Sequence, residues 1–188
     1  MSIENERKYI LSLTPRDITS LGDNYGGVHQ YIRQAYIGDV RIRTIVDFGE
    51  QETWNYIFTW KKRRADGSRI EIETNISAKD FNELWKMADR FISKRRVKIK
   101  GYGVDWDIDF LFSDDYNPGS HIPSSCYLTI AEVEMPEGMD EPEIIPKFIK
   151  DSLLYLVPRD KDEIWTNQHL SNPEIVKKML SDALTERK

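Results

Sequence analysis

Charged and apolar residues alternate along much of the first 136 positions, and this period of two is typical of β-strands. Turn-forming residues separate the alternating runs, such as Gly38 and Asp39 between two of them and residues 65–67 between two more. The pattern therefore predicts about eight strands, mostly antiparallel. The expected strands cover residues 3–13, 28–37, 40–48, 53–63, 68–76, 94–103, 104–112 and 126–135.

Helical periodicity is expected in two parts of the chain. Ser77 can cap a helix over about residues 78–92, with an apolar stripe made by Phe81, Leu84, Trp85, Ala88, Phe91 and Ile92. Beyond Pro136 the pattern changes, and residues 140–156 and 172–188 read as helices with acidic starts and basic ends. Residues 19–27 are expected to form a loop.

No linker divides the chain, so a single domain over residues 1–188 is expected. Its strand-bearing part covers about residues 3–136, and a C-terminal helical part covers about 140–188.

Charged residues recur at every second position of these strands, so each strand carries charge on one face. The rows are Glu4, Glu6, Lys8; Arg41, Arg43; Arg69, Glu71, Glu73; Lys94, Arg96, Lys98, Lys100; Asp105, Asp107, Asp109; and Glu132, Glu134. Two interpretations fit. The rows can form the solvated face of an ordinary sheet, or they can line the water-filled interior of a closed barrel whose apolar residues point outward.

The charged rows contain both bases and acids, and this mixture indicates which ligands they could bind. Arginine and lysine complement phosphate oxygens, and carboxylates hold Mg²⁺ or Mn²⁺, which bridge phosphate oxygens in turn. An interior that gathered these rows would suit a polyphosphate with its divalent cations. Buried charges without partners are costly, so such an interior needs water and substrate to neutralise it.

Composition narrows the function classes. The formal net charge of −5 gives no basic field for duplex nucleic acid or a membrane surface. The single cysteine, Cys126, forms no internal disulfide, the start of the chain does not read as a signal peptide, and no apolar run approaches the length of a membrane span. A cytoplasmic location is expected. The three histidines have no metal-ligand spacing, and no CxxC, HExxH or Walker-type motif is present.

An ordered set of short motifs resembles the CYTH superfamily, the triphosphate tunnel metalloenzymes. The segment "IENERKYIL" is similar to the family's opening ExExK signature, and seven further segments follow in the family's order over roughly residues 3–136. They are "IRQAYI", "VRIR", "TWK", "RIEIE", "KRR", "DIDF" and "AEVE". The first of these has Ala35 where the family has glycine.

The resemblance implies an α+β fold with an eight-stranded antiparallel β tunnel, a closed barrel with a charged interior that is flanked by helices. It implies hydrolysis of the terminal phosphate of inorganic, nucleoside or thiamine triphosphate with Mg²⁺ or Mn²⁺. Metal ligands would be Glu4, Glu6, Asp109, Glu132 and Glu134. Phosphate ligands would be Lys8, Arg41, Arg43, Lys61, Arg69, Lys94 and Arg96, with Glu71 and Glu73 orienting these bases or contacting metal. Catalysis would fall to Glu132, Glu134 and Lys8.

Several choices stay open at the level of sequence. Lys62 competes with Lys61, and Asp107 competes with Asp109. The family's acidic "E-V-T" strand is not visible here, and a replacement acid could come from Asp160, Asp162 or Glu163. A motif that marks the family's bacterial adenylate cyclases is also not apparent, which disfavours cyclisation.

Two other function classes compete with hydrolysis: a tunnel that binds or sequesters a nucleotide or polyphosphate without turnover, and an interaction protein without a ligand. Residues 113–125 are expected to be a solvated loop, with a lid as the alternative. The strand aromatics are expected to pack the outer face rather than stack on a ligand. The C-terminal helix is a candidate surface for a homodimer, although a solvated helix on the domain is the simpler expectation.

Overall fold

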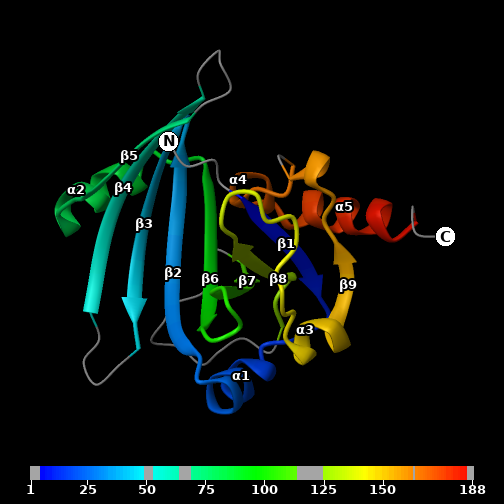
Figure 1. Cartoon of the computed structure of the whole chain (residues 1–188). Helices are drawn as coiled ribbons and strands as arrows, with labels where there is room; N and C mark the ends of the chain where they lie inside the picture. Colours follow the sequence, from blue (N-terminus) through cyan, green and yellow to red (C-terminus); the bar gives the residue numbers. More distant parts are fainter. Residues whose placement is uncertain (1–4, 49–52, 64–68, 114–124, 163, 186–188) are drawn as a thin grey trace.

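A nine-stranded antiparallel sheet forms most of the molecule (Figure 1). The computed structural model describes residues 5–48, 53–63, 69–113, 125–162 and 164–185, without the side chains of residues 63 and 69. The strands are β1 (Glu6–Leu11), β2 (Val28–Ile37), β3 (Val40–Asp47), β4 (Thr53–Arg63), β5 (Arg69–Asn75), β6 (Arg90–Ile99), β7 (Trp106–Phe112), β8 (Leu128–Glu134) and β9 (Leu153–Leu156). Their order in the sheet is β5-β4-β3-β2-β6-β7-β8-β1-β9.

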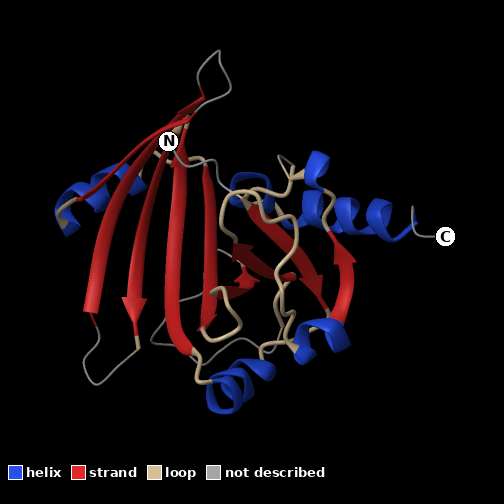
Figure 2. Cartoon of the chain, viewed as in Figure 1, coloured by secondary structure: helices blue, strands red, loops and turns tan. Residues whose placement is uncertain are grey.

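Helices lie at the ends and on the faces of this sheet (Figure 2). They are α1 (Asp17–Tyr25), α2 (Ala78–Trp85), α3 (Lys147–Ser152), α4 (Asn167–Leu170) and α5 (Pro173–Thr185), with a short 3-10 helix, η1 (Arg159–Lys161). The α+β class expected from the sequence is confirmed. No helix in the described part of the chain is long and apolar enough to cross a membrane.

The sheet is open, so the expectation of a closed eight-stranded barrel is not met. Strands β5 and β9 are its two edges, and no pairing joins them within the described residues. Strand β1 is not an edge of the sheet, because it pairs with β8 on one side and with β9 on the other. The sequence analysis assigned residues 153–156 to a helix, since a short apolar run fits both kinds of element.

The open sheet is nevertheless strongly curved. Strand pairing places Tyr36 beside Arg90, and Glu132 in the same cross-strand row as Lys98. The two rows are eight residues apart along β6, or roughly 26 Å in a flat sheet. Even so, Glu132 contributes to the raised pKa of Tyr36, which is caused chiefly by burial. Figure 1 shows the sheet curving around this face, which is called the concave face below.

The convex face carries the larger apolar core. Tyr9, Trp106 and Val97 belong to it, under a cover made by Ile18 of α1 and Ile149 of α3. The ring centroids of Tyr9 and Trp106 are 5.3 Å apart. Farther along the same face, α2 packs Phe81 on Ala35 and Ile42. Trp106 thus serves the core, as expected from the sequence, whereas Trp54 on β4 is 46% exposed.

The C-terminal segment covers part of the concave face. Ile10, Leu111 and Ile130 point to this face and form a core with Trp165 and Val176 of the C-terminal segment. The remainder of that core is Ile92, Leu128, Tyr155, Val157, Leu170 and Ala183. Apolar residues thus fill one part of the concave face, and the charged rows occupy the rest.

Two further segments differ from expectation. Helix α2 ends at Trp85, and residues 90–92 begin strand β6, because Phe91 and Ile92 fit a strand as well as a helical stripe. Helix α1 replaces the expected loop at residues 19–27. Its apolar residues Ile18 and Leu21 are three positions apart and both buried. The predicted loop or lid at residues 113–125 lies almost wholly outside the described residues.

Candidate functional site

Strand register brings the charged rows together on the concave face. Lys8 pairs with Glu132, Glu132 with Asp107, and Asp109 with Arg96. Strand alternation and these pairings give one face to the described residues of the predicted site: Glu6, Lys8, Arg41, Arg43, Lys61, Glu71, Glu73, Lys94, Arg96, Asp109, Glu132 and Glu134. Glu4 and the side chain of Arg69 lie outside the described residues.

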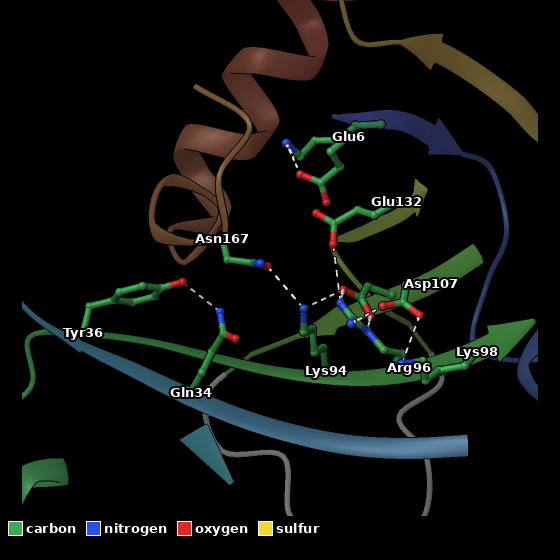
Figure 3. A network of polar contacts seen from close by, with 11 residues as sticks. Glu6, Gln34, Tyr36, Lys94, Arg96, Lys98, Asp107, Glu132 and Asn167 are labelled. Atoms are coloured by element: carbon green, nitrogen blue, oxygen red, sulfur yellow. Dashed lines mark hydrogen bonds and ion pairs between the residues drawn. The ribbon is translucent and has the colours of Figure 1, made fainter. Parts of the chain in front are cut away.

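A buried ion cluster lies at the centre of this face (Figure 3). Asp109, which is 0% exposed, accepts hydrogen bonds from Lys94 Nζ at 2.5 Å and from Arg96 Nε and Nη2 at 2.6 and 2.7 Å. Burial by itself would raise the pKa of Asp109, but Arg96 and Lys94 outweigh it and hold the pKa at about 2. Asp109 is therefore placed to orient these two bases.

Lys94 differs from the other bases because its side chain is only 2% exposed. Burial and the neighbouring Arg96 lower the pKa of Lys94, and Asp109 opposes that shift. Lys94 Nζ also donates to Asn167 Oδ1 at 3.4 Å. Arg96 is the more accessible member of the cluster, and it also contacts Asp107 and, at 3.4 Å, Glu132.

A second group of acids surrounds Lys8. Lys8 Nζ lies 3.0 Å from Glu6 Oε2 and 3.8 Å from Asp162 Oδ1. The carboxylates of Glu6 and Glu132 lie near each other (Figure 3). Burial and then the Glu6 charge raise the pKa of Glu132 to about 7. Burial also raises the pKa of Asp162; Lys8 opposes that shift and Glu6 adds to it. Three acids, Glu6, Glu132 and Asp162, thus lie around Lys8, and its single positive charge does not neutralise all of them when they are ionised.

The third group consists of bases on β3 and β4 with acids on β5. Arg43 Nη2 lies 2.7 Å from Glu73 Oε2, and Lys61 Nζ lies 3.2 Å from Glu71 Oε2. Arg41 is held loosely, with Nη2 at 3.8 Å from Glu73 and 3.9 Å from Glu71. The Nε atoms of Arg41 and Arg43 are buried without a hydrogen-bond partner. Burial and the Arg41 charge lower the pKa of Arg43. These donors suit an anion that would satisfy them.

The structure separates Lys61 from Lys62. Lys62 lies on the opposite face, where its Nζ contacts Asp39 at 2.9 Å and its side chain is 56% exposed. Asp107 and Asp109 are not alternatives in this sense, because both lie on the concave face and both contact Arg96. They differ in burial instead, with Asp109 the deeper of the two.

The C-terminal segment adds polar groups that the strand pattern could not reveal. Asp162 approaches Lys8, and Asn167 contacts Lys94. Gln168, with its amide oxygen turned to Arg90, accepts from Nη1 and Nη2 at 2.7 and 2.8 Å. Asp162 was one of three acids named from the sequence; Asp160 is exposed, and Glu163 lies outside the described residues. Nothing periodic in the sequence marked Asn167 or Gln168.

The donors available for a metal ion are carboxylates. Within the described residues, no group of three or more His, Cys, Asp or Glu side chains is arranged to hold a metal ion. Glu6 and Glu132 nevertheless lie close together (Figure 3), and the Glu6 charge adds to burial in raising the pKa of Glu132. A divalent cation would relieve the repulsion between them, and Mg²⁺ is commonly held by one or two carboxylates together with substrate phosphates and water. Glu6 and Glu132 are therefore the two carboxylates of the described residues that would hold such an ion.

Comparison with known proteins gives remote likenesses only. No protein-family model matches the chain, and no curated protein matches it. Among solved structures, a Bacillus halodurans protein described as a "putative adenylate cyclase" is 14% identical, with a TM-score of 0.45 over 88% of this chain and 98% of that chain. The PH1012 protein of Pyrococcus horikoshii OT3 is 15% identical, with a TM-score of 0.41 over 79% and 87%.

A third likeness is to a chain of the Schizosaccharomyces pombe Mediator head module. It is 10% identical, with a TM-score of 0.42 over 71% of this chain and 83% of that chain. Similarities at this level do not establish a shared function.

Proposed function

We propose that this protein binds a triphosphate-bearing small molecule on the concave face and hydrolyses its terminal phosphate with Mg²⁺ or Mn²⁺. One observation carries the proposal: the bases and carboxylates of seven different strands gather on a single curved face. Arg41 and Arg43 on this face also have buried Nε atoms without hydrogen-bond partners.

The phosphate ligands proposed are Arg41, Arg43, Lys61 and Arg96. Each is partly exposed, so its charge can reach an anion. Arginine matches phosphate oxygens in a two-pronged geometry. Lys94 would not contact the phosphates directly, because it is buried against Asp109. The acids on β5 would hold Arg41, Arg43 and Lys61 in place while the ligand is absent.

Glu6 and Glu132 are the carboxylates proposed to hold the metal ion, with Glu4 and Glu134 as neighbours in the same rows. A bound divalent ion lowers the pKa of a water ligand and neutralises charge on the phosphates. Lys8 would stay beside Glu6 and direct a phosphate oxygen. Glu132, in its ionised form, would accept a proton at its carboxylate from the attacking water. No covalent nucleophile is needed, because positioning and charge neutralisation suffice for phosphoryl transfer.

The experiment is phosphate release from tripolyphosphate, ATP, GTP and thiamine triphosphate, with Mg²⁺ and then Mn²⁺. The Glu132→Gln variant keeps the side-chain volume and removes the charge. If the natural protein releases phosphate and the Glu132→Gln variant does not, the result supports hydrolysis at this face. Equal release from both proteins would exclude the role of Glu132. No release from any compound would exclude the proposed activity.

Binding without hydrolysis is a second candidate. It is favoured by the observation that no group of three metal-binding side chains occurs in the described part of the chain, and by the use of Asp109 in ion pairs. A ligand that binds only the folded state raises the melting temperature. A rise with tripolyphosphate in the presence of chelator, together with no phosphate release, would identify this second function.

A further inference from the structure

A cavity of about 380 Å³ lies between the start of β6 and the C-terminal helices. Arg90 is on its sheet side, and Gln168, His169, Asn172 and Ile175 are on its helical side. Its volume lies within the range of small-molecule sites in proteins, about 300–1,000 Å³. None of the strand motifs contributes to it, so the function proposed above leaves it unused.

The cavity adjoins the proposed phosphate ligands. Tyr36 of β2 pairs with Arg41 on one side and with Arg90 on the other. Arg41 and Arg90 are therefore two strand spacings apart, or roughly 10 Å. The charges of Arg41, Arg43 and Arg90 all act on the Tyr36 hydroxyl. A triphosphate bound at Arg41 and Arg43 would thus have its attached group within reach of the cavity.

The lining selects among the groups that a triphosphate can carry. Gln168 and Asn172 bear amides, His169 bears an imidazole, and Ile175 adds an apolar wall that is 44% exposed. The Gln168 oxygen accepts from Arg90, Asn172 Oδ1 accepts from the first backbone N–H groups of α5, and His169 Nδ1 contacts Thr166. The two amide nitrogens and His169 Nε2 are left for a ligand beside the apolar surface, which suits a flat heterocycle with polar edges.

The charges of the lining balance each other. Arg90 and Asp89 both line the cavity, and Arg90 Nε lies 3.4 Å from Asp89 Oδ1. Inorganic triphosphate has no attached group that could fill the cavity, so the cavity favours a triphosphate that carries a ring.

We propose that this cavity holds the base of a nucleoside triphosphate, so that a nucleotide is preferred to inorganic triphosphate. The proposal rests on the proposed phosphate site. The phosphates would lie on Arg41 and Arg43, and the base would lie between Arg90 and the start of α5. The C-terminal segment would then determine which triphosphate is preferred, and the strands would bind what all triphosphates share.

The test fills the cavity without touching the phosphate ligands. Ile175→Trp places a large ring at the cavity wall, and Lys177→Trp is the matched control on an exposed face of the same helix, outside the lining. Binding of ATP, GTP, thiamine triphosphate and tripolyphosphate is measured by calorimetry with Mg²⁺. We expect Ile175→Trp to weaken ATP or GTP binding at least tenfold, to leave tripolyphosphate binding within twofold, and Lys177→Trp to change neither.

Retained tripolyphosphate binding by Ile175→Trp also shows that the variant is folded. Two results would overturn the assignment of the cavity and leave the phosphate site standing. One is that thiamine triphosphate binds most tightly, and the other is that Ile175→Trp leaves nucleotide binding unchanged. Failure of the natural protein to bind any of the four compounds would overturn both.

Discussion

Lys94 Nζ and Asp109 Oδ2 are 2.5 Å apart, and neither side chain has more than 2% of its surface exposed. Arg96 completes the arrangement by donating to both oxygens of Asp109. A carboxylate that is buried with two bases carries charge that only its partners stabilise. The pair therefore links the stability of the domain to the orientation of Arg96, the base that faces the proposed ligand.

Replacing Asp109 should destabilise the fold strongly. Asp109→Asn keeps the volume but leaves Lys94 buried without a counter-charge, and breaking a buried pair typically costs about 3–5 kcal/mol. Urea unfolding measures the change. The control is Glu71→Gln at the half-exposed pair with Lys61, for which a loss below about 1 kcal/mol is expected. Similar losses in both variants would contradict the distinction.

Glu132 should make stability fall as the pH rises. Its pKa is about 7 in the folded protein against an ordinary value of 4.5, so the folded state holds the proton more tightly. The resulting stability is fully present below pH 4.5 and is lost as the pH rises through about 7.

The Glu132→Gln variant isolates this effect. In chelator, the variant should match the natural protein at pH 4 and exceed its free energy of unfolding at pH 8 by about 1–3 kcal/mol. Chemical unfolding at the two pH values measures the difference. An equal difference at both pH values would refute the titration of Glu132 and point to a change in packing.

Arg43 should matter for anion binding, and Lys62 should not. Arg43→Ala removes a base whose Nε has no hydrogen-bond partner, and hydrogen bonds to charged groups are worth about 1.5–3 kcal/mol, or roughly 10- to 100-fold in the dissociation constant. Lys62→Ala removes the same formal charge from the opposite face and should change tripolyphosphate affinity less than about twofold. Calorimetric titration of both variants with tripolyphosphate measures the two affinities. Equal losses of affinity would indicate that only the net charge of the protein matters for binding.

Asp162 should contribute to turnover through Lys8. Asp162→Asn removes a carboxylate that lies 3.8 Å from Lys8 Nζ, and loss of a supporting group of this kind commonly costs at least tenfold in activity. Asp160→Asn is the control, since Asp160 is exposed two residues away. The expected signature is a lower kcat with KM within about twofold. Unchanged kcat in Asp162→Asn would exclude this role of Asp162.

The strands and the face that each charged residue occupies could be predicted from the sequence. Alternation is a local property, because successive side chains of a strand point to opposite faces whatever the rest of the chain does. Lys8, Arg43 and Glu132 could therefore be assigned to the charged face of their own strands, and strand pairing shows that these faces are the same face of the sheet.

Tertiary structure alone decided how the sheet ends and what covers it. Residues 153–156 join the edge of the sheet as β9, although their apolar run also fitted a helix, and β5 stays unpaired with β9. Asp162, Asn167 and Gln168 reach the charged face only because Trp165 and Val176 pack on apolar residues of the distant strands. Such contacts depend on side-chain burial between segments far apart in sequence, and no local period records them.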